Sequence, residues 1–156
     1  MSIQTIAIAS ALMLFAGSAL AAERVGRTIE AQETVSGEGA VGNRVIARAD
    51  PIYRDERLRS NVTGLGQFEL GDGSKLVLGR NASLVVDRYV SGGGGKAKNV
   101  TLRLVSGSVR FLSGASDKKA YRINTPQGTI GVRGTAFDLT VRNGKTYLLL
   151  LPRNSR

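Results

Sequence analysis

The side-chain chemistry open to this chain of 156 residues is narrow, because the sequence contains neither histidine nor cysteine. A Ser-His-Asp triad, an imidazole general base, thiolate metal ligands and the usual histidine-containing zinc sites are therefore excluded. Asp72, Asp87 and Asp138 are far apart in the sequence, and a turn or the polar face of a strand accounts for each. Glycoside hydrolysis needs two carboxylates about 5 to 9.5 Å apart, and calcium needs several clustered oxygen ligands. The sequence thus predicts a protein that is not an enzyme and holds no metal or cofactor.

Arg133 is the best single candidate for a special role. It lies between Gly131 and Gly134 in the segment 125–137, whose mixture of turn-forming and apolar residues suits a tightly wound β segment. We expect the crowded backbone to bury the Arg133 side chain partly, so that its five N–H donors satisfy loop carbonyls or an acid such as Asp138. The alternative is that Arg133 contacts a partner or a ligand.

The neighbouring residues of this segment are expected to be structural first. Thr129 and Thr135 would hydrogen-bond across turns. Thr135 is also, with Arg133, a candidate binding residue. Gly131 and Gly134 would supply backbone conformations or close approaches that a Cβ atom blocks. A Gly134→Val substitution would then destabilise the fold strongly.

Short β-type runs position these residues from residue 44 onward. Apolar and polar side chains alternate in several runs, as in 137–141, and this period of two is typical of strands with one buried face. Ten strands are predicted, at 45–47, 66–70, 75–78, 83–89, 100–105, 108–112, 121–124, 129–132, 137–142 and 145–151. The predicted fold class is therefore all-β, with about ten short strands in a compact sandwich or a short solenoid-like domain.

The connections between these runs carry their own signals. The four glycines at 92–95 predict a flexible exposed loop, because the helix and the Gly-Lys-Ser/Thr that a phosphate cradle requires do not follow. Only 55–62 could form a helical turn. Tight turns are expected at three pairs that contain glycine: Asp72-Gly73, Ser106-Gly107 and Asn143-Gly144.

An export signal is expected at 1–21. The run 6–16 is apolar, and Ala19 and Ala21 have the spacing that a signal peptidase recognises, so cleavage is predicted after Ala21. The alternative is an N-terminal membrane anchor, but the run is shorter than the ~20 apolar residues of a spanning helix. The mature chain would be periplasmic or secreted and would have no transmembrane span.

The segment 22–43 shows no sustained period and is predicted to be a flexible lead-in. Its residues 37–42 match the pattern G-x-G-x-x-G, but no apolar strand precedes them and Pro51 interrupts any following helix, so they are interpreted as turn or linker residues. The expected organisation is a signal peptide at 1–21, the lead-in, a β domain at 44–151 and a tail at 152–156.

The formal net charge of +10 lies in the second part of the chain. Residues 61–156 contain fifteen basic and five acidic side chains, whereas 23–60 contain seven of each. A basic β domain outside the cytoplasm has lipid phosphates, acidic polysaccharide or an acidic protein surface as candidate partners. Nucleic acid is not expected as a partner, because export separates the protein from it. A basic surface that only aids solubility is the alternative.

Three blocks of this sequence, taken in order, resemble the FecR-type domain. They are 66–84, which begins Gly-Gln-Phe-Glu-Leu-Gly-Asp-Gly, then 102–111, and finally Thr125-Pro126 with the Gly-Val-Arg-Gly-Thr of 131–135. The resemblance covers roughly 44–151. It implies a periplasmic sensory domain of the kind found in bacterial iron-uptake regulators, and hence a protein-interaction or regulatory module of the cell envelope. A binding module for anionic envelope polysaccharide or lipid is the alternative function.

The sequence departs from the FecR pattern at both ends. The iron-signalling regulators place an anti-sigma segment and a membrane helix before this domain, whereas here the expected signal peptide leads almost directly into it, so this chain is not expected to relay a signal into the cytoplasm itself. FecR-type domains usually add a turn and one more strand after the run at 145–151, and this strand is not found at 152–156. Either the last strand is absent or the end is a truncated or frameshifted remnant, and we therefore expect an unpaired sheet edge there.

Overall fold

The computed structural model describes residues 21–39 and 41–152, and most of this part of the chain is in β-strands. The predicted signal peptide up to residue 20 and the last four residues of the predicted tail lie outside the described residues. No helix in the described ranges is long and apolar enough to cross a membrane. The all-β fold class is confirmed.

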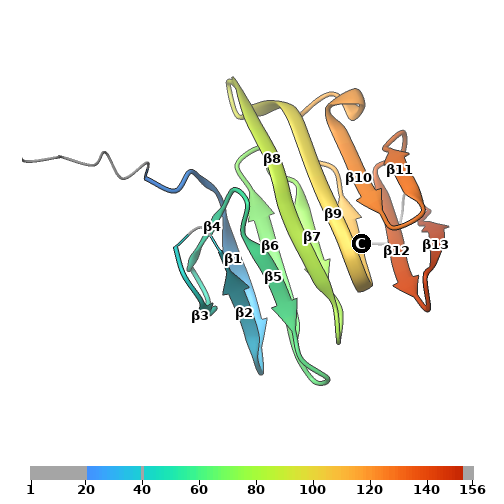
Figure 1. The fold of residues 1–156 in the computed structure, drawn as a ribbon. Coiled ribbons are helices and arrows are strands. Elements are labelled where there is room, and N and C mark those ends of the chain that lie inside the picture. The colour runs from blue at the N-terminus through green and yellow to red at the C-terminus, as the bar shows by residue number, and fades with distance from the viewer. Residues whose placement is uncertain (1–20, 40, 153–156) are drawn as a thin grey trace, which may run out of the picture.

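Thirteen strands and one short 3-10 helix follow one another along the described chain (Figure 1). They are β1 (Arg24–Gln32), β2 (Val35–Glu38), β3 (Arg44–Val45), β4 (Pro51–Tyr53), β5 (Arg57–Ser60), β6 (Leu65–Leu70), β7 (Lys75–Leu78), β8 (Ser83–Gly93), β9 (Lys96–Leu112), η1 (Lys118–Ala120), β10 (Tyr121–Thr125), β11 (Gly128–Gly131), β12 (Ala136–Arg142) and β13 (Lys145–Leu150).

The strands form one curled sheet whose two halves share the long strand β9. One half has the order β4-β1-β6-β7-β9-β12-β13, and the other has the order β3-β2-β5-β8-β9-β10-β11. Neighbouring strands are antiparallel except for β9 and β10, which run parallel. Figure 1 shows β5 and β8 in front of β6 and β7, and the hairpins β10–β11 and β12–β13 at the opposite end from β3 and β4.

Strand β9 passes from one half of the sheet to the other at Gly107. Up to Ser106 it pairs with β8. From Gly107 onward it pairs with β12 along one side, and from Val109 onward it also pairs with β7 along the other. Gly107 has a φ of +77°, and a Cβ atom on it would lie 2.5 Å from the Cα atom of Ala82. The predicted hairpin turn at Ser106-Gly107 is therefore wrong, because the strand bends there and continues.

Alternating side chains from both halves fill the core. In β12 the buried positions are Phe137, Leu139 and Val141, as the alternation predicted. Phe111 of β9 contacts Phe137 beside it and Tyr121 from the other half, with ring centroids 5.4 and 5.2 Å apart. Burial of each large apolar side chain contributes about 1.5 to 3 kcal/mol, so these contacts hold the two halves of the sheet together.

The predicted strands after residue 66 correspond to observed strands, and 75–78 coincides with β7 at both ends. The two runs at 100–105 and 108–112 belong to the single strand β9. Tight turns are confirmed between β6 and β7, where Gly73 has a φ of +80°, and between β12 and β13, where Asn143 and Gly144 both have positive φ.

Two predictions near the N-terminus are wrong. The segment 22–43 is not a flexible lead-in, because it contains β1, which pairs with β4 and β6, and β2, which pairs with β3 and β5. The segment 55–62 contains no helical turn, because β5 lies between β2 and β8 with Leu58 and Ser60 buried. In both segments, pairing with distant strands decides a conformation that the local sequence leaves open.

Candidate functional site

The structure leaves Arg133 exposed, just after β11. No hydrogen bond or ion pair joins its guanidinium to any other described residue. Asp138, its predicted acidic partner, lies opposite Arg110 in the register of β12 and β9 and accepts two hydrogen bonds from it, at 2.7 and 2.8 Å. The prediction that Arg133 is a partly buried donor is therefore wrong, and its side chain is available to a ligand.

Gly131 and Gly134, on either side of Val132 and Arg133, also differ from expectation. A Cβ atom on Gly131 or Gly134 would have no heavy atom within 4 Å, and neither residue has a positive φ. Thr135 is exposed and contributes its carbonyl oxygen, which accepts from the Ser113 backbone N–H at 2.9 Å. The cross-turn hydrogen bond is observed for Thr129, whose hydroxyl donates to the Asn124 side chain at 2.8 Å.

A buried polar cluster lies behind the turn between β6 and β7. The carboxylate of Asp72 accepts from the Tyr121 hydroxyl at 2.6 Å, from the Ser116 hydroxyl at 2.7 Å and from the Ser74 backbone N–H at 3.1 Å. Burial alone would raise the pKa of Asp72, but these hydrogen bonds outweigh it and the pKa is lowered. The Gly114 backbone N–H donates to the Tyr121 oxygen in turn. The cluster joins the β6–β7 turn at 72–74 to the segment 114–121, which is about forty residues away in the sequence.

A second buried charge is found beside β5. Glu56 is fully buried, and one of its oxygens accepts from the guanidinium of Arg44 at 2.7 and 3.1 Å, while the other accepts from the Tyr53 backbone N–H at 3.0 Å. Arg44 also donates to the Pro51 carbonyl at 2.6 Å. Because these polar groups satisfy one another in the interior, the pair has a structural role.

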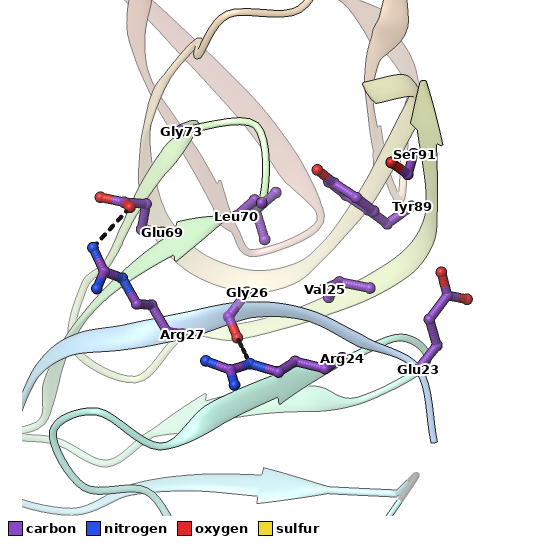
Figure 2. Close-up of a pocket in the computed structure, with 11 residues that line it drawn as sticks. Glu23, Arg24, Val25, Gly26, Arg27, Glu69, Leu70, Gly73, Tyr89 and Ser91 are labelled. Carbon is purple, nitrogen blue, oxygen red and sulfur yellow. Dashed lines mark hydrogen bonds and ion pairs between the residues drawn. The ribbon is translucent and has the colours of Figure 1, made fainter. Parts of the chain in front are cut away.

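An open hollow of about 400 Å³ lies between β1, the β6–β7 turn and β8 (Figure 2). The charged side chain of Arg27 forms an ion pair with Glu69 at 3.1 Å, and Arg24 donates to the Gly26 carbonyl at 3.3 Å. Tyr89 is 8% exposed, and burial together with the charge of Asp72 and the nearby Tyr121 raises its pKa to about 12. Its phenol therefore keeps its proton at neutral pH.

The most unusual surface is the sheet edge formed by β13. Within the described part of the chain β13 pairs only with β12, as expected for the unpaired edge. Leu148 and Leu150 lie opposite Leu139 and Phe137, on the core side of the sheet, and Tyr147 and Leu149 point to the other side. The exposed fractions are 56% for Tyr147, 48% for Leu148, 62% for Leu149 and 68% for Leu150. Sequence reasoning identified the edge but not the apolar character of both faces.

The described residues contain no group of three or more acidic, histidine or cysteine side chains placed to hold a metal ion. Asp87, like Asp138, is engaged on the surface, where it accepts from Arg103 at 2.6 Å. The three acids that sequence analysis singled out thus have three separate local environments, and the structure does not bring them together.

Comparison with known proteins places the chain in a family. The family model described as FecR protein matches residues 56–151, which is more than half of the chain. No curated protein and no solved structure gives a significant match. The matched region begins just before β5 and ends after β13, so it includes the buried Asp72 cluster, the segment around Arg133 and the apolar edge. The chain therefore belongs to the FecR family.

Proposed function

We propose that this protein is a non-catalytic module of the bacterial envelope that binds another protein through the edge strand β13, in a regulatory or sensory role. The observation that carries the proposal is the run of four large apolar side chains on β13. Membership of the FecR family supports the regulatory role. The export signal predicted at 1–21 supports a periplasmic location.

An edge strand offers one row of backbone N–H and C=O groups to a further strand. A partner segment in extended conformation would satisfy these groups and place alternate side chains on the two faces of β13. Leu148 and Leu150 would be covered on the core side, and Tyr147 and Leu149 on the other. Long apolar edges are usually protected in soluble proteins, so an edge of this composition is typical of an interaction surface.

The proposal can be tested in cells with a photoreactive amino acid at position 149. The matched control is Val62, which is equally apolar and 66% exposed but lies in the loop between β5 and β6. We expect irradiation to give an adduct with one other envelope protein from position 149 and none from position 62.

A second variant distinguishes strand addition from nonspecific contact. It carries the photoreactive residue at position 147 together with Leu149→Lys. Its adduct should fall sharply below that of the photoreactive residue at position 147 alone, because a charge on an edge strand opposes strand addition. Adducts that contain only two copies of this chain, or equal adducts from positions 149 and 62, would overturn the proposal.

A further inference from the structure

We infer that a groove lined by basic side chains, on the surface around η1, binds an acidic polysaccharide. The groove consists of two adjoining hollows of about 440 and 690 Å³, which share Asp117 and Lys119. Its cations, which we call the basic groove residues, are Lys96, Lys98, Lys118, Lys119, Arg122 and Arg133. None of them belongs to β13, so this inference is independent of the proposed function.

The strand arrangement explains why cations from three regions of the sequence meet here. Strands β9 and β10 run parallel, with Arg122 beside Thr101, so η1 at the start of β10 lies close to the first residues of β9, which include Lys98. Strand β11 returns antiparallel to β10 and pairs Gly131 with Arg122. Arg133, two residues after Gly131, therefore lies next to the start of β10.

The groove carries a large excess of positive charge that the protein itself does not neutralise. Six cations against the single carboxylate of Asp117 give a net charge of +5. No hydrogen bond or ion pair joins the side chains of Lys96, Lys98, Lys119, Arg122 or Arg133 to another described residue. Asp117 itself caps η1 by accepting from the Lys119 backbone N–H at 2.9 Å. Unpaired cations that converge on a concave surface raise the local concentration of anions.

The form of the groove favours a chain of repeated anionic groups over a membrane surface. Cations line both hollows, so an extended ligand that runs through them would meet positive charge along its length. Proteins that bind lipid surfaces usually insert apolar side chains next to the basic ones. In this protein no well-exposed large apolar side chain of the described residues lines the groove. Those side chains are Val41, Val45, Val62, Val90, Val105, Tyr147, Leu148, Leu149 and Leu150.

The chemistry of the lining predicts how such a polymer would be recognised. Arg122 and Arg133 can each hold a carboxylate or phosphate group through two N–H donors, and the lysines act as point charges. Tyr121 is the groove's one aromatic residue among those described, and it is buried, so stacking on sugar rings contributes little. Binding should therefore depend on charge and weaken as salt rises.

The experiment measures binding of the purified chain to polygalacturonate, with neutral dextran and phosphatidylglycerol vesicles as the other probes. The test variant is Arg122→Gln with Arg133→Gln. The matched control is Arg48→Gln with Arg80→Gln, which removes the same two charges from exposed positions outside the groove. We expect the test variant to lose roughly tenfold in affinity and the control to lose less than about threefold. Since none of these four side chains forms a hydrogen bond or ion pair with another described residue, all variants should keep the melting temperature of the parent.

Four results would overturn the inference. These are no binding of polygalacturonate at low salt, equal losses in the two double variants, binding that is insensitive to salt, and binding of the vesicles with none of polygalacturonate. The last result would assign the cations to a lipid surface instead. A failure of β13 to capture a protein would leave these measurements unaffected.

Discussion

Removal of the Tyr121 hydroxyl provides the sharpest test of the buried polar cluster. In Tyr121→Phe the ring still packs against Phe111, but Asp72 loses its shortest hydrogen bond, of 2.6 Å, and the Gly114 N–H loses one of its two acceptors. A hydrogen bond to a charged group contributes about 1.5 to 3 kcal/mol. We therefore expect the free energy of unfolding at pH 7 to fall by about 1.5 to 3 kcal/mol, and the melting temperature by roughly 6 to 12 °C.

The dependence on pH identifies Asp72 as the source of this effect. Its pKa is lowered by the fold from its usual 3.8, so its contribution to stability is complete above the usual pKa and is lost as the pH falls through the lowered one. Burial and the bond to Asp72 raise the pKa of Tyr121, so its hydroxyl remains a donor at neutral pH. The difference between parent and variant should consequently be largest near pH 7 and shrink in acid.

Urea unfolding followed at several pH values measures both quantities. Asp72→Asn serves as the comparison, because it keeps the shape of the side chain and removes its charge. In that background Tyr121→Phe should cost less than it does alone, since the charge-assisted bond no longer exists. A loss below about 0.5 kcal/mol at pH 7, or a difference that stays constant down to acid, would refute the reasoning.

Three further substitutions, one of them a control, test the backbone bend and the second buried charge. Gly107→Ala should destabilise the fold by about 3 kcal/mol or more, because its Cβ would collide with the backbone of Ala82 at positive φ, whereas Gly134→Ala should change the stability by less than about 0.5 kcal/mol. Similar melting temperatures for these two variants would contradict the account of β9. Arg44→Met should cost about 3 to 5 kcal/mol in urea unfolding, because it leaves Glu56 buried without its cation; a cost below about 1 kcal/mol would show that Glu56 does not need the pair.

Much of the fold follows from local patterns where alternation is long and regular. The run 137–141 predicted both the strand β12 and which side chains it buries, and Gly73 and Asn143-Gly144 predicted their turns. The first strands could not be predicted in this way. β1 has few large apolar residues and contains an irregularity between Thr28 and Glu30, which interrupts its period of two.

The candidate site was less accessible to sequence reasoning than the fold. Sequence reasoning gave Arg133 the partner Asp138, but Asp138 accepts from Arg110 on another strand, and the Arg133 side chain is exposed. The groove that Arg133 lines depends on the parallel pairing of β9 with β10, which no local pattern indicates. Sequence reasoning assigned Asp72 only a role in its turn. The three hydroxyl groups that lie near it come from positions 74, 116 and 121, and the last two are distant from it in the sequence.

Hydrogen–deuterium exchange at β13 tests the central claim most directly. The chain would be measured alone and in complex with the purified envelope protein captured from position 149. The proposal predicts that the backbone amides of Lys145–Leu150 exchange more slowly in the complex, because a partner strand covers the edge, while those at the distant β8–β9 hairpin end, 92–95, are unchanged. A complex that forms without slower exchange at β13, or with protection confined to other strands, would contradict the account.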